Sequence, residues 1–191
     1  MSDDICDAAR SGDTEDIQAL LKAGASVDTC DPSLRMTPLH WAASSSHVEA
    51  CKVLLDNHAT VDARDAFHMT PLHRATKKGA NEVVVLLTAW GADVNARSEI
   101  LSTPLHEATG EGHHDVLRYL LKVGADISAT DSNGNAALYW AAVKGQLVSC
   151  EILLRAGADA NASNRFGRTA MDGAREKGQS ELCTLLQRYS R

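Results

Sequence analysis

Thr37-Pro38-Leu39-His40 decides the fold of this chain, because the same four residues return at a fixed step. They stand again at Thr70 to His73 and at Thr103 to His106, each copy 33 residues after the previous one. Two degenerate copies keep the spacing, Ala136 to Tyr139 and Thr169 to Asp172. A fixed period of this length indicates a protein built from stacked structural repeats.

Each copy of the motif predicts the start of a short helix. In the second copy, the hydroxyl of Thr70 suits the helix N-cap, and Pro71 suits the first helical position, where its missing N–H costs nothing. Small residues follow at Ala75 and Thr76, which lets neighbouring helices approach closely. Gly79 then ends the helix, because a left-handed C-cap is least costly for glycine. We therefore expect a helix from Pro71 to Lys78 and counterparts in the other modules.

A second helix follows in every module, since apolar residues recur there at helical spacing. Leu86 lies in this run, and we expect it to be buried. Cys51, Cys150 and Cys183 occupy one position of the same register, which favours core packing over redox chemistry. His58 stands where most modules have glycine, and histidine tolerates the left-handed conformation expected there.

The T-P-L-H-x-A pattern with its 33-residue period resembles the ankyrin-repeat family over nearly the whole chain. The resemblance implies an all-α repeat solenoid of helix-turn-helix modules joined by β-hairpin loops. It also implies that partners dock on the hairpin tips and on a concave face lined by the first helices. We expect one domain over residues 1–191, divided into an N-terminal cap at 3–31, internal repeats at 32–64, 65–97, 98–130 and 131–163, and a C-terminal cap at 164–191.

The hairpin tips depart from a polar turn in three consecutive modules. Ser132-Asn133-Gly134 is polar and contains glycine, whereas the three preceding tips lack glycine and carry apolar side chains. Adjacent tips lie about 10 Å apart if the helix pairs pack at a normal distance, so these side chains would form one strip. Such a strip indicates a partner site, although some members could instead fold back onto the neighbouring hairpins. The candidates are Leu34, Met36, Phe67, Met69, Ile100 and Leu101.

The residue after each motif histidine varies and is expected to face the concave side. Trp and Arg are enriched in binding hot spots, which makes these positions candidate partner contacts. Arg74 and Glu107 lie in adjacent modules and could instead pair with each other. Lys77 adds basic charge, although a solvated charged face explains it as well. The candidates on this face are Trp41, Arg74, Lys77, Glu107 and Trp140.

Two further patterns suggest chemistry and are weighed against simpler explanations. His106, His113 and His114 lack a matching carboxylate or cysteine at ligand spacing, so we expect no metal site. Asn95 and Asn161 follow an aspartate in a context that resembles the ankyrin targets of an asparaginyl hydroxylase. A hydrogen bond from each asparagine side chain to its own hairpin is the simpler interpretation.

The formal net charge of −6 and the absence of a continuous basic stripe argue against a nucleic-acid partner. We find no apolar membrane segment, secretion signal, phosphate loop or catalytic motif, and we expect a cytoplasmic or nuclear monomer without cofactors. The sequence predicts a non-catalytic protein-interaction module that acts as an adaptor, inhibitor or assembly factor. Its partner would be a segment with apolar anchors and some acidic residues. The alternatives are a regulatory subunit associated with an enzyme, or a hydroxylase substrate.

Overall fold

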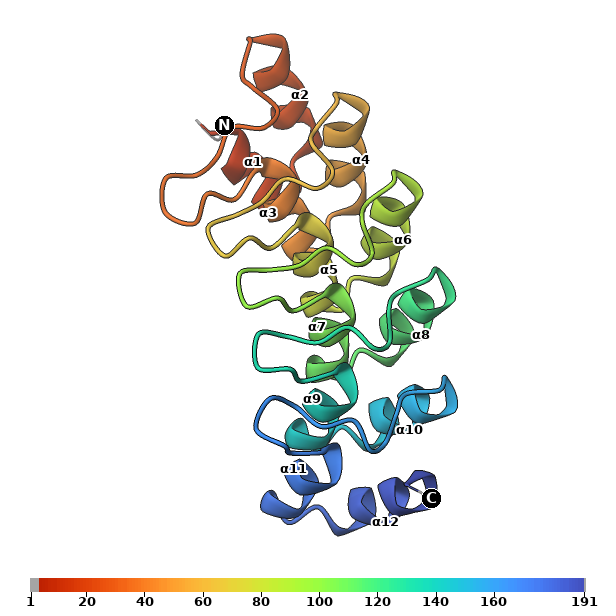
Figure 1. Ribbon diagram of the computed structural model, residues 1–191. Helices are drawn as coiled ribbons and strands as arrows, with labels where there is room; N and C mark the ends of the chain where they lie inside the picture. The colour runs from red at the N-terminus through yellow and green to blue at the C-terminus, as the bar shows by residue number, and fades with distance from the viewer. Residues whose placement is uncertain (1–3, 191) are drawn as a thin grey trace. The chain divides into compact units, whose positions relative to one another are not determined.

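The computed structural model describes residues 4–190, and this part of the chain forms twelve α-helices in consecutive pairs (Figure 1). The first helix of each pair begins at the four-residue motif or its counterpart. The helices are α1 (Ile5–Ser11), α2 (Thr14–Lys22), α3 (Pro38–Ser44), α4 (Val48–Asp56), α5 (Pro71–Lys78), α6 (Asn81–Ala89), α7 (Pro104–Glu111), α8 (His114–Lys122), α9 (Ala137–Lys144), α10 (Leu147–Arg155), α11 (Ala170–Glu176) and α12 (Ser180–Tyr189).

Backbone contacts divide the chain into two compact units, Met1–Glu99 and Ile100–Arg191. In the first unit, α1, α3 and α5 stack in one row, and α2, α4 and α6 stack in a second row. The second unit repeats this arrangement, with α7, α9 and α11 in one row and α8, α10 and α12 in the other. The prediction of an all-α fold of stacked helix pairs is confirmed. The single continuous domain over residues 1–191 stays a prediction.

The motif threonine caps the first helix of its module. Thr70 has an extended backbone, and its side chain accepts a hydrogen bond from the N–H of His73. In the opposite direction, Nδ1 of the His73 ring accepts a hydrogen bond from the N–H of Thr70 at 3.2 Å. This reciprocal capping box satisfies two N–H groups that the helix start would otherwise leave unpaired. Thr37, Thr103 and Thr169 cap α3, α7 and α11 in the same way.

The motif histidine also joins its module to the next one. His40 is fully buried, its Nδ1 accepts the N–H of Thr37 at 3.1 Å, and its Nε2 lies 3.0 Å from the carbonyl oxygen of Met69. Because Nδ1 accepts, the proton sits on Nε2, which donates to Met69. In the second unit, His106 bonds the carbonyl of Asn135 at 3.0 Å. The histidine is therefore both a cap and a cross-module tie.

Leucines fill the space between the two rows of helices. Leu39 and Leu72 of the first row are fully buried, as are Leu54 and Leu87 of the second row. Leu86 is only half-buried, so its predicted burial is wrong. The residue that points into the core is its neighbour Leu87, because the buried face of α6 is set by Val83, Val84 and Leu87.

Two helix ends that lack glycine keep the positive backbone φ angle of their glycine counterparts. Ser46 has φ 63° and His58 has φ 66°, and each stands where most modules place a glycine. The left-handed conformation predicted for His58 is confirmed.

The segments between helix pairs are turns. Within residues 4–190 the only β-pairing is two isolated bridges, Thr130 with Ala136 and Ser163 with Thr169. The loops predicted as β-hairpins therefore contain no strands.

Truncating Leu87 and Leu86 one at a time should show which of the two side chains lies in the core. We expect Leu87→Ala to lower the free energy of unfolding by about 2 to 5 kcal/mol, because it leaves a cavity in the core. Leu86→Ala should cost clearly less, since water already reaches that side chain. Urea unfolding followed by circular dichroism measures both. Equal losses would contradict the assignment of Leu87 as the core residue.

Acid should weaken the module tie at His40. Burial lowers the pKa of His40 below its ordinary value of 6.5, because the charged ring would lose its water. The contribution of His40 to the free energy of unfolding is therefore fully present above pH 6.5, where the ring is neutral in the folded and in the unfolded chain. It falls at lower pH, because the unfolded chain takes up the proton and the folded chain does not. His40→Gln removes the titrating ring and keeps an acceptor for the cap. Urea unfolding between pH 7 and about 5 should show a smaller loss for this variant than for the unchanged protein.

Candidate functional site

The five loop tips share one backbone conformation. One residue of each tip has a φ in the left-handed region, and these residues recur every 33 positions: Arg35, His68, Leu101, Gly134 and Gly167. The residue just before it occupies an equivalent position in every tip, namely Leu34, Phe67, Ile100, Asn133 and Phe166. The first three tips adopt this conformation without glycine. A bulky residue such as Leu101 rarely does so unless its surroundings impose it.

A carboxylate at the base of the first tip imposes the turn. Asp31 Oδ1 accepts the N–H groups of Ser33 and Leu34 at 2.9 and 2.8 Å, and its Oδ2 accepts the N–H of Met36 at 2.8 Å. Partial burial alone would raise the pKa of Asp31, but these N–H groups and the Ser33 hydroxyl outweigh it and lower the pKa to about 2. The charged carboxylate therefore holds the tip at neutral pH.

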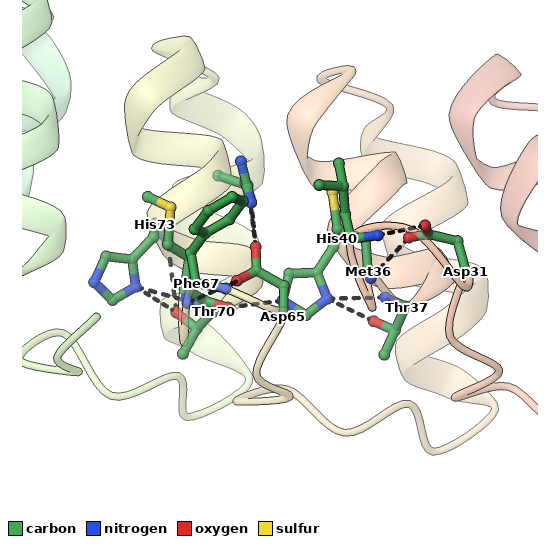
Figure 2. Close-up of polar contacts among 11 residues, drawn as sticks. Asp31, Met36, Thr37, His40, Asp65, Phe67, Thr70 and His73 are labelled. Carbon is green, nitrogen blue, oxygen red and sulfur yellow. Dashed lines mark hydrogen bonds and ion pairs between the residues drawn. The ribbon is translucent and has the colours of Figure 1, made fainter. Parts of the chain in front are cut away.

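The second tip uses the same device and adds an arginine. Asp65 is buried, and its Oδ1 accepts the N–H groups of Phe67 and Met69 at 2.8 and 2.9 Å (Figure 2). Its Oδ2 accepts Arg74 Nε at 2.8 Å and also pairs with Arg74 Nη2. The guanidinium carbon of Arg74 lies 5.9 Å from the centre of the Phe67 ring. Asp65 thus holds the main chain of Phe67 and the guanidinium that lies beside its ring.

The last two tips are held by related groups. Asp131 accepts the N–H groups of Asn133 and Asn135, and its Oδ2 accepts the indole N–H of Trp140 at 2.9 Å. In the last tip an asparagine replaces the aspartate. Asn164 Oδ1 accepts the N–H groups of Phe166 and Arg168 at 2.9 and 3.0 Å. A neutral acceptor is therefore sufficient to form this turn.

Main-chain hydrogen bonds join neighbouring tips within each unit. In the first unit, Ala66 donates its N–H to the carbonyl of Leu34 at 2.8 Å. In the second unit, Ser132 donates to Ile100 at 2.8 Å and Arg165 donates to Asn133 at 3.0 Å. Adjacent tips are therefore aligned as well as individually rigid.

The structure separates the predicted tip residues into two groups. Phe67 is 49% exposed, Ile100 is 51% exposed and Leu101 is also exposed, while Leu34 is half-buried. Met36 and Met69 are buried, at 2% and 8% exposure, so their assignment to an exposed strip is wrong. They come after the left-handed residue, which turns the chain back toward the helices.

The predicted residues of the first helices differ in their surroundings. Trp41 is half-buried and lies under the guanidinium of Arg10. The guanidinium carbon is 5.3 Å from the centre of the Trp41 ring. Lys77 is exposed. Arg74 and Trp140 are half-buried and held by the tip carboxylates Asp65 and Asp131.

Glu107 does not belong to the exposed surface that the sequence predicts for a partner. Its side chain is only 7% exposed, and it accepts a hydrogen bond from the Ser102 hydroxyl at 3.0 Å. It serves the fold of its own loop. Arg74 binds Asp65 of its own unit.

Sequence reasoning missed three features of these surfaces. Phe166 is 71% exposed and occupies the same tip position as Phe67, three modules later. Arg10 covers Trp41 from the preceding module. Asp31 and Asp65 hold the tips. The register of the repeat could have found Phe166 and the aspartates, whereas nothing in the sequence indicates the Arg10 contact.

Residues 5–98 and 101–164 match a family model described as ankyrin repeats, in three copies. The chain belongs to the ankyrin-repeat family. Ankyrin domains are generally scaffolds for protein–protein interaction, and the described helices pair into about six such modules.

Three cysteines of this ankyrin chain are buried in its core. Cys6, Cys51 and Cys150 are buried free thiols, and burial raises the pKa of each to about 12. Cys183 is half-buried and Cys30 is exposed. In residues 4–190, no group of three His, Cys, Asp or Glu side chains is placed to hold a metal ion. None of the helices described is long and apolar enough to cross a membrane.

The two asparagines discussed as modification sites lie on exposed turns of the ankyrin modules. The N–H of Asn95 donates to the carboxylate of Asp93 at 2.9 Å, and the N–H of Asn161 donates to Asp159 at 2.8 Å. Both asparagines are exposed. This geometry explains the turn and leaves their modification a prediction.

Asp31→Asn should remove one acid-sensitive element of the ankyrin fold. The carboxylate has a lowered pKa in the folded state, so its contribution to stability is present above its ordinary pKa of 3.8 and is lost as the pH falls toward 2. The variant should fold, because Asn164 forms the same turn. Denaturant unfolding between pH 5 and about 2 should show a weaker pH dependence for Asp31→Asn. An unchanged pH dependence would contradict a charged Asp31 in the tip.

Proposed function

We propose that this ankyrin-repeat protein is a non-catalytic interaction module, an adaptor, inhibitor or assembly factor, that binds another protein through its loop tips and first helices. The observation that carries the proposal is Phe67, which is exposed on a tip held rigid by Asp65 and Arg74. An exposed aromatic ring on a fixed backbone contributes contact area to a complex with little loss of entropy. Interfaces concentrate their binding energy in aromatic and arginine side chains of this kind.

Each of the two units carries its own set of residues that we propose to contact a partner. In the first unit they are Leu34, Trp41, Phe67, Arg74 and Lys77. In the second unit they are Ile100, Leu101, Trp140 and, from its exposure, Phe166. Met36, Met69 and Glu107 are left out because they are buried.

The environment of the histidines supports a role without catalysis. Both ring nitrogens of His40 are engaged, with Thr37 and with Met69, so the ring has no free nitrogen for acid–base chemistry. The free buried thiols are typical of a reducing compartment, which supports a location in the cytoplasm or nucleus. We propose that the protein acts there as a monomer.

Affinity capture from a eukaryotic cell lysate tests this function. We expect Phe67→Ala to reduce the capture of at least one protein strongly, because hot-spot truncations commonly cost about 2 kcal/mol or more of binding free energy. Trp90→Ala is the control, since it removes an exposed aromatic ring of the same unit that lies at the end of α6, outside the tips and first helices. Mass spectrometry quantifies the captured proteins, and thermal unfolding checks that both variants fold. Identical capture by unchanged protein and by Phe67→Ala would place the partner elsewhere and contradict the proposed site.

A further inference from the structure

We propose that Cys6 and Cys30 form an oxidation site, at which a small disulfide such as oxidised glutathione converts the two thiols into a disulfide bond between α1 and the loop that leads into the first tip. This inference goes beyond the proposed function and does not depend on it. Three properties of this part of the first unit support it: the direction of the Cys6 thiol, the exposure of Cys30 and the burial of Cys6.

The thiol of Cys6 faces the loop that contains Cys30. Its Sγ lies 3.4 Å from the carbonyl oxygen of Thr29, the residue immediately before Cys30, and 3.9 Å from the carbonyl oxygen of Met36. Across a trans peptide of standard dimensions, a carbonyl oxygen lies about 2.8 Å from the Cα of the next residue. The sulfur of Cys6 is therefore within about 6.2 Å of the Cα of Cys30.

Cys30 lies on an exposed stretch of the same loop. Thr29 and Cys30 are both exposed, and the Cys30 thiol contacts only the carbonyl oxygen of Asp28 among the hydrogen bonds described, at 3.6 Å. A disulfide joins sulfurs about 2 Å apart, which places one sulfur about 4 Å from the Cα of the other cysteine. From the limit of about 6.2 Å, this requires an approach of about 2 Å and a rotation of the Cys30 side chain. An exposed loop can make this movement while α1 stays packed against α3.

The burial of Cys6 assigns an order to the reaction. Cys6 is only 4% exposed, so a molecule the size of oxidised glutathione reaches Cys30 first. Burial raises the pKa of Cys6 to about 12, and the charges of Asp4, Asp31 and Cys30 add to this effect. The Cys6 thiol is therefore protonated at neutral pH and acts second, once a mixed disulfide stands beside it.

Two exchange steps complete the reaction. The thiolate of Cys30 attacks one sulfur of oxidised glutathione, which breaks the glutathione S–S bond, forms a mixed disulfide on Cys30 and releases one glutathione thiolate. The thiolate of Cys6 then attacks Sγ of Cys30, which forms the Cys6–Cys30 bond and releases the second glutathione thiolate. The two protons of the protein thiols pass through water to the released glutathione. Two protein thiols are thus oxidised, and one glutathione disulfide is reduced to two thiols.

The bond would appear only when the surrounding thiol pool becomes oxidised. In a reducing compartment glutathione keeps both cysteines as thiols, and disulfides that form there are commonly transient. A bond from residue 6 to residue 30 closes a loop of about 25 residues and restricts the unfolded chain. We therefore expect the oxidised protein to unfold at a temperature several degrees higher than the reduced protein.

Peptide mapping of the full chain tests the inference. The folded protein is incubated with oxidised glutathione, the remaining thiols are blocked with iodoacetamide, and the protein is digested with trypsin without reductant. Trypsin cleaves after lysine and arginine, which places Cys6 in the peptide 1–10 and Cys30 in the peptide 23–35. We expect mass spectrometry to find these two peptides joined and to find them separate after reduction.

Two variants and one solvent provide the controls. Cys30→Ser should abolish the joined peptide and the rise in unfolding temperature, whereas Cys183→Ser, which removes another incompletely buried thiol, should leave both unchanged. In concentrated urea the unfolded chain should pair its cysteines without this preference. Thermal unfolding of the reduced variants checks that they fold.

Three outcomes would overturn the inference. Cys30 that carries only glutathione would show that Cys6 does not complete the reaction. Cys30 joined to a second copy of the chain would show that its partner lies outside this molecule. Pairing of Cys6 with Cys30 that is no more selective in the folded protein than in urea would show that the fold does not bring the two thiols together.

Discussion

The structure depends on one buried histidine in each of three modules. Its Nδ1 accepts an N–H at the start of its own helix, and in His40 and His106 the Nε2 donates to a carbonyl of the following module. One neutral ring thus satisfies polar groups of two modules in an interior without water, where an unpaired polar group costs about 1 to 3 kcal/mol. Asp172 replaces the histidine in the last module and reproduces the cap within it.

The tips are built by a separate device. In four of the five tips an aspartate or asparagine behind the tip accepts the N–H groups of the turn, so these tips keep their shape whether the left-handed residue is Gly167 or His68. Side chains that point outward from the tip are not needed to hold it. The fold is therefore maintained by the helices and the tip bases, and the chemical character of the surface is set by other residues.

The helices were predictable because their signals are local. Thr70, Pro71 and Gly79 mark the start and end of α5, and the structure places them as N-cap, first residue and C-cap. The surface was predictable only in part. Phe67 and Ile100 are exposed as expected, but Met36 and Met69 are buried, since the positive φ at Arg35 and His68 reverses the direction of the chain. Leu86 and Leu87 are adjacent apolar residues, and a period of 3.6 residues does not decide which of them enters the core.

The residue before the left-handed one takes part in the turn through its main-chain N–H, which has a consequence for substitutions at its side chain. Leu34, Phe67, Ile100, Asn133 and Phe166 occupy the same position and include aliphatic, aromatic and amide side chains on one backbone conformation. A substitution at such a position alters what the surface can bind and leaves the hydrogen bonds of the turn unchanged. The exposed side chains of this protein can thus change one tip at a time while the main-chain hydrogen bonds of the turn are kept.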